Sequence, residues 1–341
     1  MNNLTSQKAP YDFGRSIFMP FQSGEGSVGF VFKSAFFYGI MMTVLIFLFG
    51  KMMMGSFIEF MQAASALETE PSSGDEMEAV MQMFGMMGKM FIPIILIFLG
   101  GWVIWAMVEA ALFRRILRED EDEVSSSLFP WRLGMDEIRV MFCRLIVGLA
   151  GFSIFILLYF VLIVVIVGAV AGGTQSGALG AIIGLLGFLG VVAAFALFVF
   201  ITIRLAPASA LSIAENRFAL GDAWPVTKGR FWPIFGSYAL IGVAGMVVSQ
   251  VLQTILMVAF MGSFMAMIPD LEKMGGMQPD ESIAQMIEMI TQPSMLAGIA
   301  VALILYYVFE ALWYMHFAGV SAHAVNLYKT DQSENSLEVF D

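Results

Sequence analysis

Cysteine and histidine are scarce in this chain of 341 residues. A single cysteine, Cys143, excludes an internal disulfide framework, and no zinc-type cysteine spacing is present. The only two histidines, His316 and His323, are seven residues apart. On a helix that is about two turns, roughly 10 Å, too far for both to bind one metal without a partner between them. We therefore expect no cofactor, and we interpret both histidines as interfacial or hydrogen-bonded, with a ligand or pH-switch role as the alternative.

Charge is also sparse, and this excludes an ordinary soluble domain. Only 13% of the residues are charged, 59% are hydrophobic, and the mean hydropathy is +0.83. The net charge of −11 argues against nucleic acid as a partner. Six charge-free apolar runs approach or exceed the roughly 20 residues that a spanning helix needs. They are residues 34–50, 90–108, 145–171, 177–203, 231–261 and 294–309.

The few basic residues are distributed unevenly around these runs. Fourteen of the seventeen Lys and Arg lie in the N-terminal part, the second and fourth connections, and the C-terminal part. Only Lys51, Lys89 and Lys273 lie on the other side. Cytoplasmic loops of membrane proteins carry an excess of Lys and Arg. The sequence therefore predicts an all-α, six-span membrane protein with both termini in the cytoplasm, and it shows no cleavable signal peptide.

The spans group into three hairpins, which resemble one another weakly. The middle hairpin closes through a short turn at 172–176, and the outer two through long Met-rich segments in which interfacial amphipathic helices are expected. Glycines along 177–190 predict close packing of the fourth span. The predicted organisation is a cytoplasmic tail with an interfacial part at 1–33, a membrane domain at 34–329 and a cytoplasmic tail at 330–341. Within the domain, the outer segments are 51–89 and 263–293, and the inner segments are 114–144 and 205–230.

Three charged residues occupy equivalent depths near the cytoplasmic ends of the even-numbered spans: Glu109, Arg204 and Glu310. An unpaired charge within a span costs about 2.5–3.5 kcal/mol on insertion scales, so such residues usually face the bundle interior and pair. One interpretation is a structural clamp that ties the hairpins together. The alternatives are separate snorkelling to water and a proton- or ion-coupled transport site.

Methionine is concentrated in the two outer segments. Of 28 methionines, 18 lie in 52–90 and 261–295. Thioethers are soft ligands that suit Cu(I), and the candidate metal ligands are Met81, Met83, Met86 and Met87. Packing, an adaptable apolar surface for another membrane protein, and oxidant sensing are the other interpretations.

A second candidate site lies in the inner segment 214–236, where aromatic and basic residues alternate. Trp rings collect at the headgroup layer of membranes, and Lys and Arg beside them suit phospholipid headgroups. The candidate headgroup residues are Arg217, Trp224, Lys228, Arg230 and Trp232. Asp222 is expected to cap a short helix that starts at Ala223. The plainer interpretation is an elbow that steers the chain into the fifth span. The preceding inner segment, 129–139, has the same aromatic and basic character.

The stretch from Arg204 through Gly236 resembles bacterial six-span inner-membrane proteins of the kind fused to some glycerophosphoryl diester phosphodiesterases. These carry a run of small residues and then an Ala-Trp-x-x-Thr-x-Gly turn, matched here by Ala223, Trp224, Thr227 and Gly229. The resemblance implies architecture and a lipid link. It implies no catalysis, because no soluble stretch is long enough for the phosphodiesterase barrel.

We therefore expect a non-enzymatic module of the bacterial cytoplasmic membrane that binds lipids or scaffolds a partner membrane protein. The alternative is a small transporter or channel that uses the intramembrane Glu-Arg-Glu cluster. No nucleophile–base pair or nucleotide-binding loop supports an enzyme.

Overall fold

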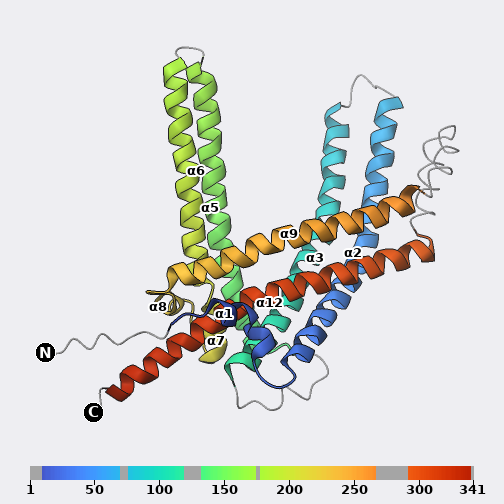
Figure 1. The fold of residues 1–341 in the computed structure, drawn as a ribbon. Helices are drawn as coiled ribbons and strands as arrows, with labels where there is room; N and C mark the ends of the chain where they lie inside the picture. The colour runs from blue at the N-terminus through green and yellow to red at the C-terminus, as the bar shows by residue number, and fades with distance from the viewer. Residues whose placement is uncertain (1–9, 70–75, 119–131, 174–176, 266–290, 339–341) are drawn as a thin grey trace. The chain divides into compact units, whose positions relative to one another are not determined.

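The computed structural model describes residues 10–69, 76–118, 132–173, 177–265 and 291–338 (Figure 1). These parts of the chain are helical, with turns between the helices and no strands. Six of the helices are long and apolar enough to cross a membrane. They are α2 (Ser27–Thr69), α3 (Glu76–Leu117), α5 (Met135–Gly173), α6 (Gly177–Leu205), α9 (Phe231–Met265) and α12 (Pro293–Glu338). The chain is therefore a multi-pass membrane protein, as the sequence predicts.

Two compact units share these helices. The first unit contains Met1–Ser27, Glu109–Ile241 and His316–Asp341, and the second contains Val28–Val108 and Gly242–Met315. The division falls inside α3, α9 and α12, so each of these helices contributes one part to each unit.

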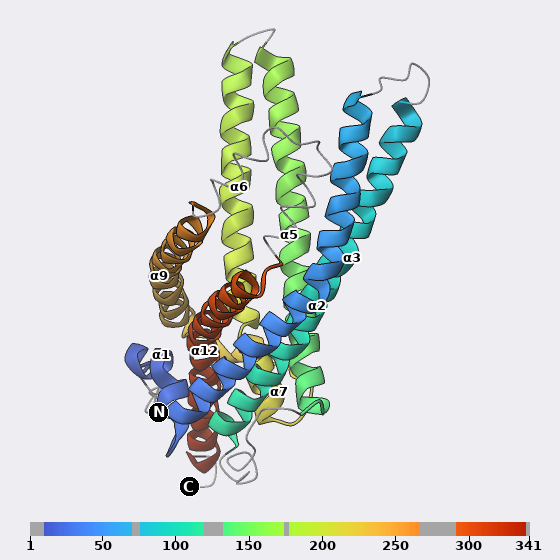
Figure 2. The same ribbon diagram turned by 90° about the vertical axis from the view of Figure 1, so that its right-hand side faces the viewer.

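In the first unit, α5 and α6 form an antiparallel pair, and they run side by side in both views (Figure 1 and Figure 2). A Cβ placed on Gly187 would lie 2.1 Å from a methyl group of Val165, and one on Gly168 would lie 3.1 Å from Ile183. The helix backbones approach closely because these positions carry no side chain. The glycine-rich face of the fourth span thus packs within the chain.

The described part of the first unit also contains three short helices: α1 (Phe13–Gln22), α7 (Ala208–Ala214) and α8 (Ala223–Val226). Helix α7 packs against α5 and is buried from Ala208 to Ile213, whereas α8 contacts α6. Helix α1 is amphipathic, with Ser16, Met19 and Pro20 buried and Phe13 and Phe18 exposed. It lies within 1–33, for which the sequence predicts an interfacial part, and its position at the membrane surface stays a prediction.

Backbone carbonyl groups of α1 contact α12 at His316 and Gly319. The Asp12 carboxylate caps α1 by accepting a hydrogen bond from the Arg15 N–H at 3.0 Å. The His316 Nδ1 lies 2.8 Å from the Ile17 carbonyl oxygen, and a Cβ on Gly319 would lie 2.9 Å from the Ser16 carbonyl oxygen. His316 is thus hydrogen-bonded, as expected. His323, also expected to be interfacial or hydrogen-bonded, is buried, with its Nε2 lacking a partner in the described structure.

The second unit contains the membrane-spanning parts of the other two hairpins. Helices α2 and α3 meet where Gly100 faces Leu45 and Gly101 faces Met42. Helix α12 approaches α9 where Gly245 faces the Trp313 indole. The three expected hairpins are therefore α2–α3, α5–α6 and α9–α12, and the predicted fold class is confirmed. Helix α12 continues to Glu338, through most of the segment expected as a C-terminal tail.

Candidate functional site

The buried carboxylate of Glu109 pairs with a residue that the sequence did not single out. Arg144, on α5, donates from Nε to Glu109 Oε2 at 3.1 Å and from its terminal nitrogen to Oε1 at 2.5 Å. Glu109 is fully buried near the end of α3. A two-bond fork of this kind satisfies a buried carboxylate in charge and geometry. The structural clamp at Glu109 therefore joins α3 to α5.

Arg204 has different partners from those expected. Its guanidinium carbon lies 5.2 Å from the ring centres of Phe200 and Trp224 and 5.4 Å from that of Phe231. Its terminal nitrogen donates to Thr227 Oγ1 at 2.8 Å. Cation–π contacts are worth about 0.5–2 kcal/mol each. Stacking on three rings thus replaces the expected pairing with Glu109.

Glu310 belongs to the second unit and has its own surroundings there. The Tyr314 hydroxyl donates a hydrogen bond to its carboxylate. The Tyr314 ring packs 5.5 Å from Trp105, which in turn lies 5.6 Å from Tyr38. The three charges grouped from the sequence therefore have three separate sets of partners. Glu310 forms no ion pair within the described structure.

The expected headgroup residues divide into surface and interior groups. Trp224 and Trp232 are 45% and 74% exposed, and Lys228 is exposed beside them. Arg230 is only 5% exposed, and it forms a two-bond ion pair with Asp331 on α12. Its charge is neutralised inside the protein, so it differs from the expected headgroup ligand.

Arg217 is exposed, but two acids share its charge. Its terminal nitrogens lie 2.5 Å from Glu215 and 2.7 Å from Asp222. The hydrogen bond to Asp222 and the charge of Glu215 raise the pKa of Arg217 above its ordinary value. Asp222 stands at the N-cap of α8, as expected, but its side chain makes no capping hydrogen bond because it pairs with Arg217 instead.

The exposed residues Trp224, Lys228 and Trp232 lie in and beside a tight turn that follows α8. Thr227 Oγ1 donates to the Trp224 carbonyl at 3.1 Å, and the Arg230 N–H donates to the Thr227 carbonyl at 3.2 Å. Gly229 has φ +82°, a conformation that residues with a Cβ rarely adopt. This turn buries Arg230 and leaves Trp232 on the surface. We call Arg204, Trp224, Thr227, Lys228 and Trp232 the elbow site.

The preceding inner segment forms a second charged cluster, which the sequence marked only by its similarity to the elbow. The Arg114 terminal nitrogen donates to Glu137 at 2.6 Å, and Arg118 donates to both oxygens of Asp136 at 3.0 and 3.2 Å. Arg118 also donates to the Ile213 carbonyl of α7. The end of α3, the start of α5 and the end of α7 are thus joined by ion pairs and hydrogen bonds.

The start of α5 is capped from within. The Glu137 carboxylate accepts a hydrogen bond from the Gly134 N–H at 2.8 Å, and Gly134 directly precedes the helix. A side chain at the third helical position that binds the N-cap N–H is one half of a capping box. Glu137 therefore fixes the first turn of α5 and holds Arg114 at the same time.

The candidate copper ligands are tested only in part. Met81 and Met87 are exposed on α3, while the side chains of Met83 and Met86 lie outside the described residues. Most of the second Met-rich segment, 266–290, also lies outside them. Within the described residues, no group of three or more His, Cys, Asp or Glu could hold a metal. Cu(I) binding stays a prediction.

Comparison with known proteins adds no relative. No family model, no curated protein and no solved structure matches the chain.

Proposed function

We propose that this chain is a non-enzymatic module of the bacterial cytoplasmic membrane that binds anionic phospholipid headgroups at the elbow site, with both termini in the cytoplasm. The observation that carries the proposal is the state of Arg204. Its guanidinium stacks on three rings, and its Nε has no hydrogen-bond partner in the described structure.

Arg204 retains the capacity to bind an anion. Its hydrogen bond to Thr227 occupies one terminal nitrogen, whereas a guanidinium carries five N–H donors. The three rings restrict the side chain, so little conformational entropy remains to be lost on binding. Planar guanidinium groups bind phosphate through parallel hydrogen bonds.

The surroundings of Arg204 suit the headgroup layer. Trp224 and Trp232 expose their indoles, which favour the boundary between hydrocarbon and water. Lys228 adds an exposed ammonium group in the same turn. The resemblance of this stretch to membrane domains fused to glycerophosphoryl diester phosphodiesterases agrees with a lipid link. The distribution of Lys and Arg supports a cytoplasmic position for the elbow.

Native mass spectrometry of the detergent-extracted protein tests this function. We expect the protein to retain added phosphatidylglycerol in preference to phosphatidylcholine, and to lose that preference in Lys228→Gln and Trp232→Ala. Lys51→Gln is the matched control, because Lys51 is an exposed lysine on the expected opposite side of the membrane. Equal retention of the two lipids by the unmodified protein, or equal losses in Lys51→Gln and Lys228→Gln, would contradict the proposal.

A transport function is the second candidate, and Glu310 is the observation that favours it. Its carboxylate accepts from Tyr314 and has no cationic partner in the described structure. Ionisable residues inside spans commonly mark ion or proton pathways. Reconstituted vesicles that show a proton or cation flux abolished by Glu310→Gln, with normal insertion, would favour this candidate over the lipid module.

A further inference from the structure

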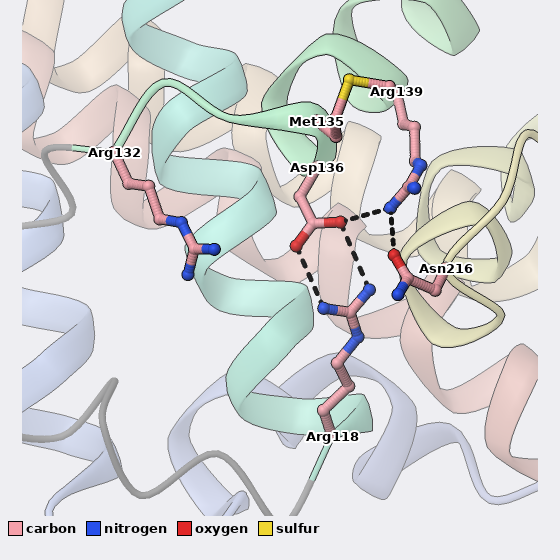
Figure 3. Close-up of a pocket in the computed structure, with 6 residues that line it drawn as sticks. All are labelled: Arg118, Arg132, Met135, Asp136, Arg139 and Asn216. Atoms are coloured by element: carbon pink, nitrogen blue, oxygen red, sulfur yellow. Dashed lines mark hydrogen bonds and ion pairs between the residues drawn. The ribbon is translucent and has the colours of Figure 1, made fainter.

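A second basic site lies at the junction of α3, α5 and α7, in the first unit. A pocket of about 170 Å³ opens there, lined by Arg118, Arg132, Met135, Asp136, Arg139 and Asn216 (Figure 3). Its volume is several times the roughly 30 Å³ that one water molecule occupies in the liquid.

Asp136 holds two of the three arginines in place. Its carboxylate accepts both terminal nitrogens of Arg118 and, at 2.7 Å, one nitrogen of Arg139 (Figure 3). Arg139 also donates to Asn216 Oδ1. Asn216 adopts a left-handed conformation, with φ 56°, just after α7. The guanidinium groups of Arg118 and Arg139 are therefore pre-positioned by contacts within the protein.

The lining has an excess of positive charge. Three arginines face one aspartate, which leaves a formal charge of +2. Behind the lining, Arg114 and Glu137 form their own ion pair and add no net charge. Arg132 is exposed and makes no hydrogen bond or ion pair within the described structure. The Nε of Arg139 is buried and likewise has no partner there.

We propose that this pocket binds a phosphate monoester, in addition to the lipid site at the elbow and independently of it. A phosphate monoester carries close to two negative charges at neutral pH, which matches the excess charge of the lining. The Arg132 guanidinium offers phosphate a parallel pair of N–H donors, whereas the donors of Arg118 are directed to Asp136 and to the Ile213 carbonyl. The pocket also contains the first residue of α5, Met135, at the helix end whose dipole favours anions.

Either a free phosphorylated molecule or the headgroup of phosphatidic acid presents this chemistry. Two measurements distinguish these sources. The first titrates the full-length protein in detergent with inorganic phosphate. The second compares the protein reconstituted in phosphatidylcholine vesicles with and without phosphatidic acid. Saturable binding of inorganic phosphate supports the proposal for a soluble ligand. Binding that requires phosphatidic acid supports it for the lipid.

Arg132→Gln is the decisive variant, because the Arg132 side chain makes no hydrogen bond or ion pair within the described structure, so its loss breaks none. We expect it to weaken binding about tenfold or more, as loss of a hydrogen bond to a charged group does. Arg132→Glu, which lowers the charge of the lining by two, should abolish binding. Arg217→Gln is the matched control, since it removes an exposed arginine that two acids already neutralise.

The result that overturns the proposal is absence of binding to both probes, or the same affinity in Arg132→Gln as in the unmodified protein. Equal weakening in Arg132→Gln and Arg217→Gln would also overturn it, because it would show a general effect of net charge. Lipid binding at the elbow is measured separately, with the Lys228 and Trp232 variants. The proposal for one site can therefore be contradicted without affecting the proposal for the other.

Discussion

Arg230 and Asp331 are 101 residues apart in the chain and form a two-bond ion pair, with nitrogen–oxygen distances of 2.7 and 2.8 Å. The Arg230 side chain is almost fully buried and that of Asp331 is 13% exposed. The pair connects the turn after α8 to the last turns of α12. It therefore makes the end of α12 part of the folded first unit.

Asp331→Ala should lower thermal stability because it leaves the charge of Arg230 buried without its main partner. Breaking a buried pair costs about 3–5 kcal/mol. Thermal unfolding of the detergent-solubilised protein, followed by circular dichroism, measures the effect. Glu334→Ala, an exposed carboxylate three residues further along α12, is the control and should unfold at the original temperature. An equal loss in both variants would show that the pair has no special role.

Glu109→Gln should destabilise the protein, whereas Glu310→Gln should not. The first change removes the charge that Arg144 pairs with at the end of α3, and it should cost less than the roughly 3 kcal/mol of a fully buried pair because the Arg144 side chain is 37% exposed. The second retains a side-chain oxygen that can accept from Tyr314. Comparing the unfolding temperatures of the two variants separates a structural carboxylate from one available for another role. Equal stability of both would argue against the α3–α5 clamp.

Gly187→Ala should loosen the α5–α6 hairpin, because its Cβ would lie 2.1 Å from Val165. Overpacking typically costs about 1–3 kcal/mol. Gly184→Ala on the same helix meets nothing within 4 Å and should be neutral or slightly stabilising. Adding Val165→Ala to Gly187→Ala should restore part of the loss in thermal unfolding. Without that rescue, the close contact would not be the cause.

Gly229→Ala should strain the turn that builds the elbow site, since φ +82° disfavours any residue with a Cβ. We expect a loss of about 1–3 kcal/mol and faster proteolysis between α8 and α9. Gly221→Ala, in the same segment and with open space around it, is the control. Limited proteolysis of the purified protein should cleave Gly229→Ala first, and identical cleavage rates would show that the turn tolerates a side chain.

Tyr11 should make stability fall at alkaline pH. Its hydroxyl lies 3.1 Å from Ser237 Oγ, and burial raises the pKa of Tyr11 above its ordinary value near 10. The folded state therefore holds this proton more tightly than the unfolded state, and stability decreases as pH rises past 10. Tyr11→Phe removes that part of the decrease. Unfolding temperatures at pH 8 and above pH 10 measure it, and unchanged pH dependence in Tyr11→Phe would contradict the assignment.

The long helices could be predicted from the sequence, because length and hydropathy alone determine which segments cross a membrane. The three hairpins followed from short and long connections, and the glycines of α6 indicated close packing that Gly187 and Gly190 now show. These features depend on local composition, so no knowledge of distant contacts was needed.

The partners of the charged residues could not be predicted in the same way. Equivalent depth in three similar hairpins suggested Arg204 for Glu109, but the start of α5 supplies Arg144 instead. Arg230 lies among aromatic residues as a headgroup ligand would, yet its partner Asp331 lies in a segment that looked like a tail. Such pairings depend on which helix ends meet in three dimensions. The repeated aromatic and basic character of 129–139 was the one sequence signal for the Arg118 and Asp136 cluster.

The ion pairs that join α3 to α5 also have a consequence for biogenesis. Arg114 and Arg118 follow one span, whereas Asp136 and Glu137 begin the next, so these pairs form only after the second helix has been made. Until then the arginines lack these two partners, and positive charge beside a span sets its orientation during insertion. We therefore expect the same side chains to direct the topology of the nascent chain first and to be paired by packing later.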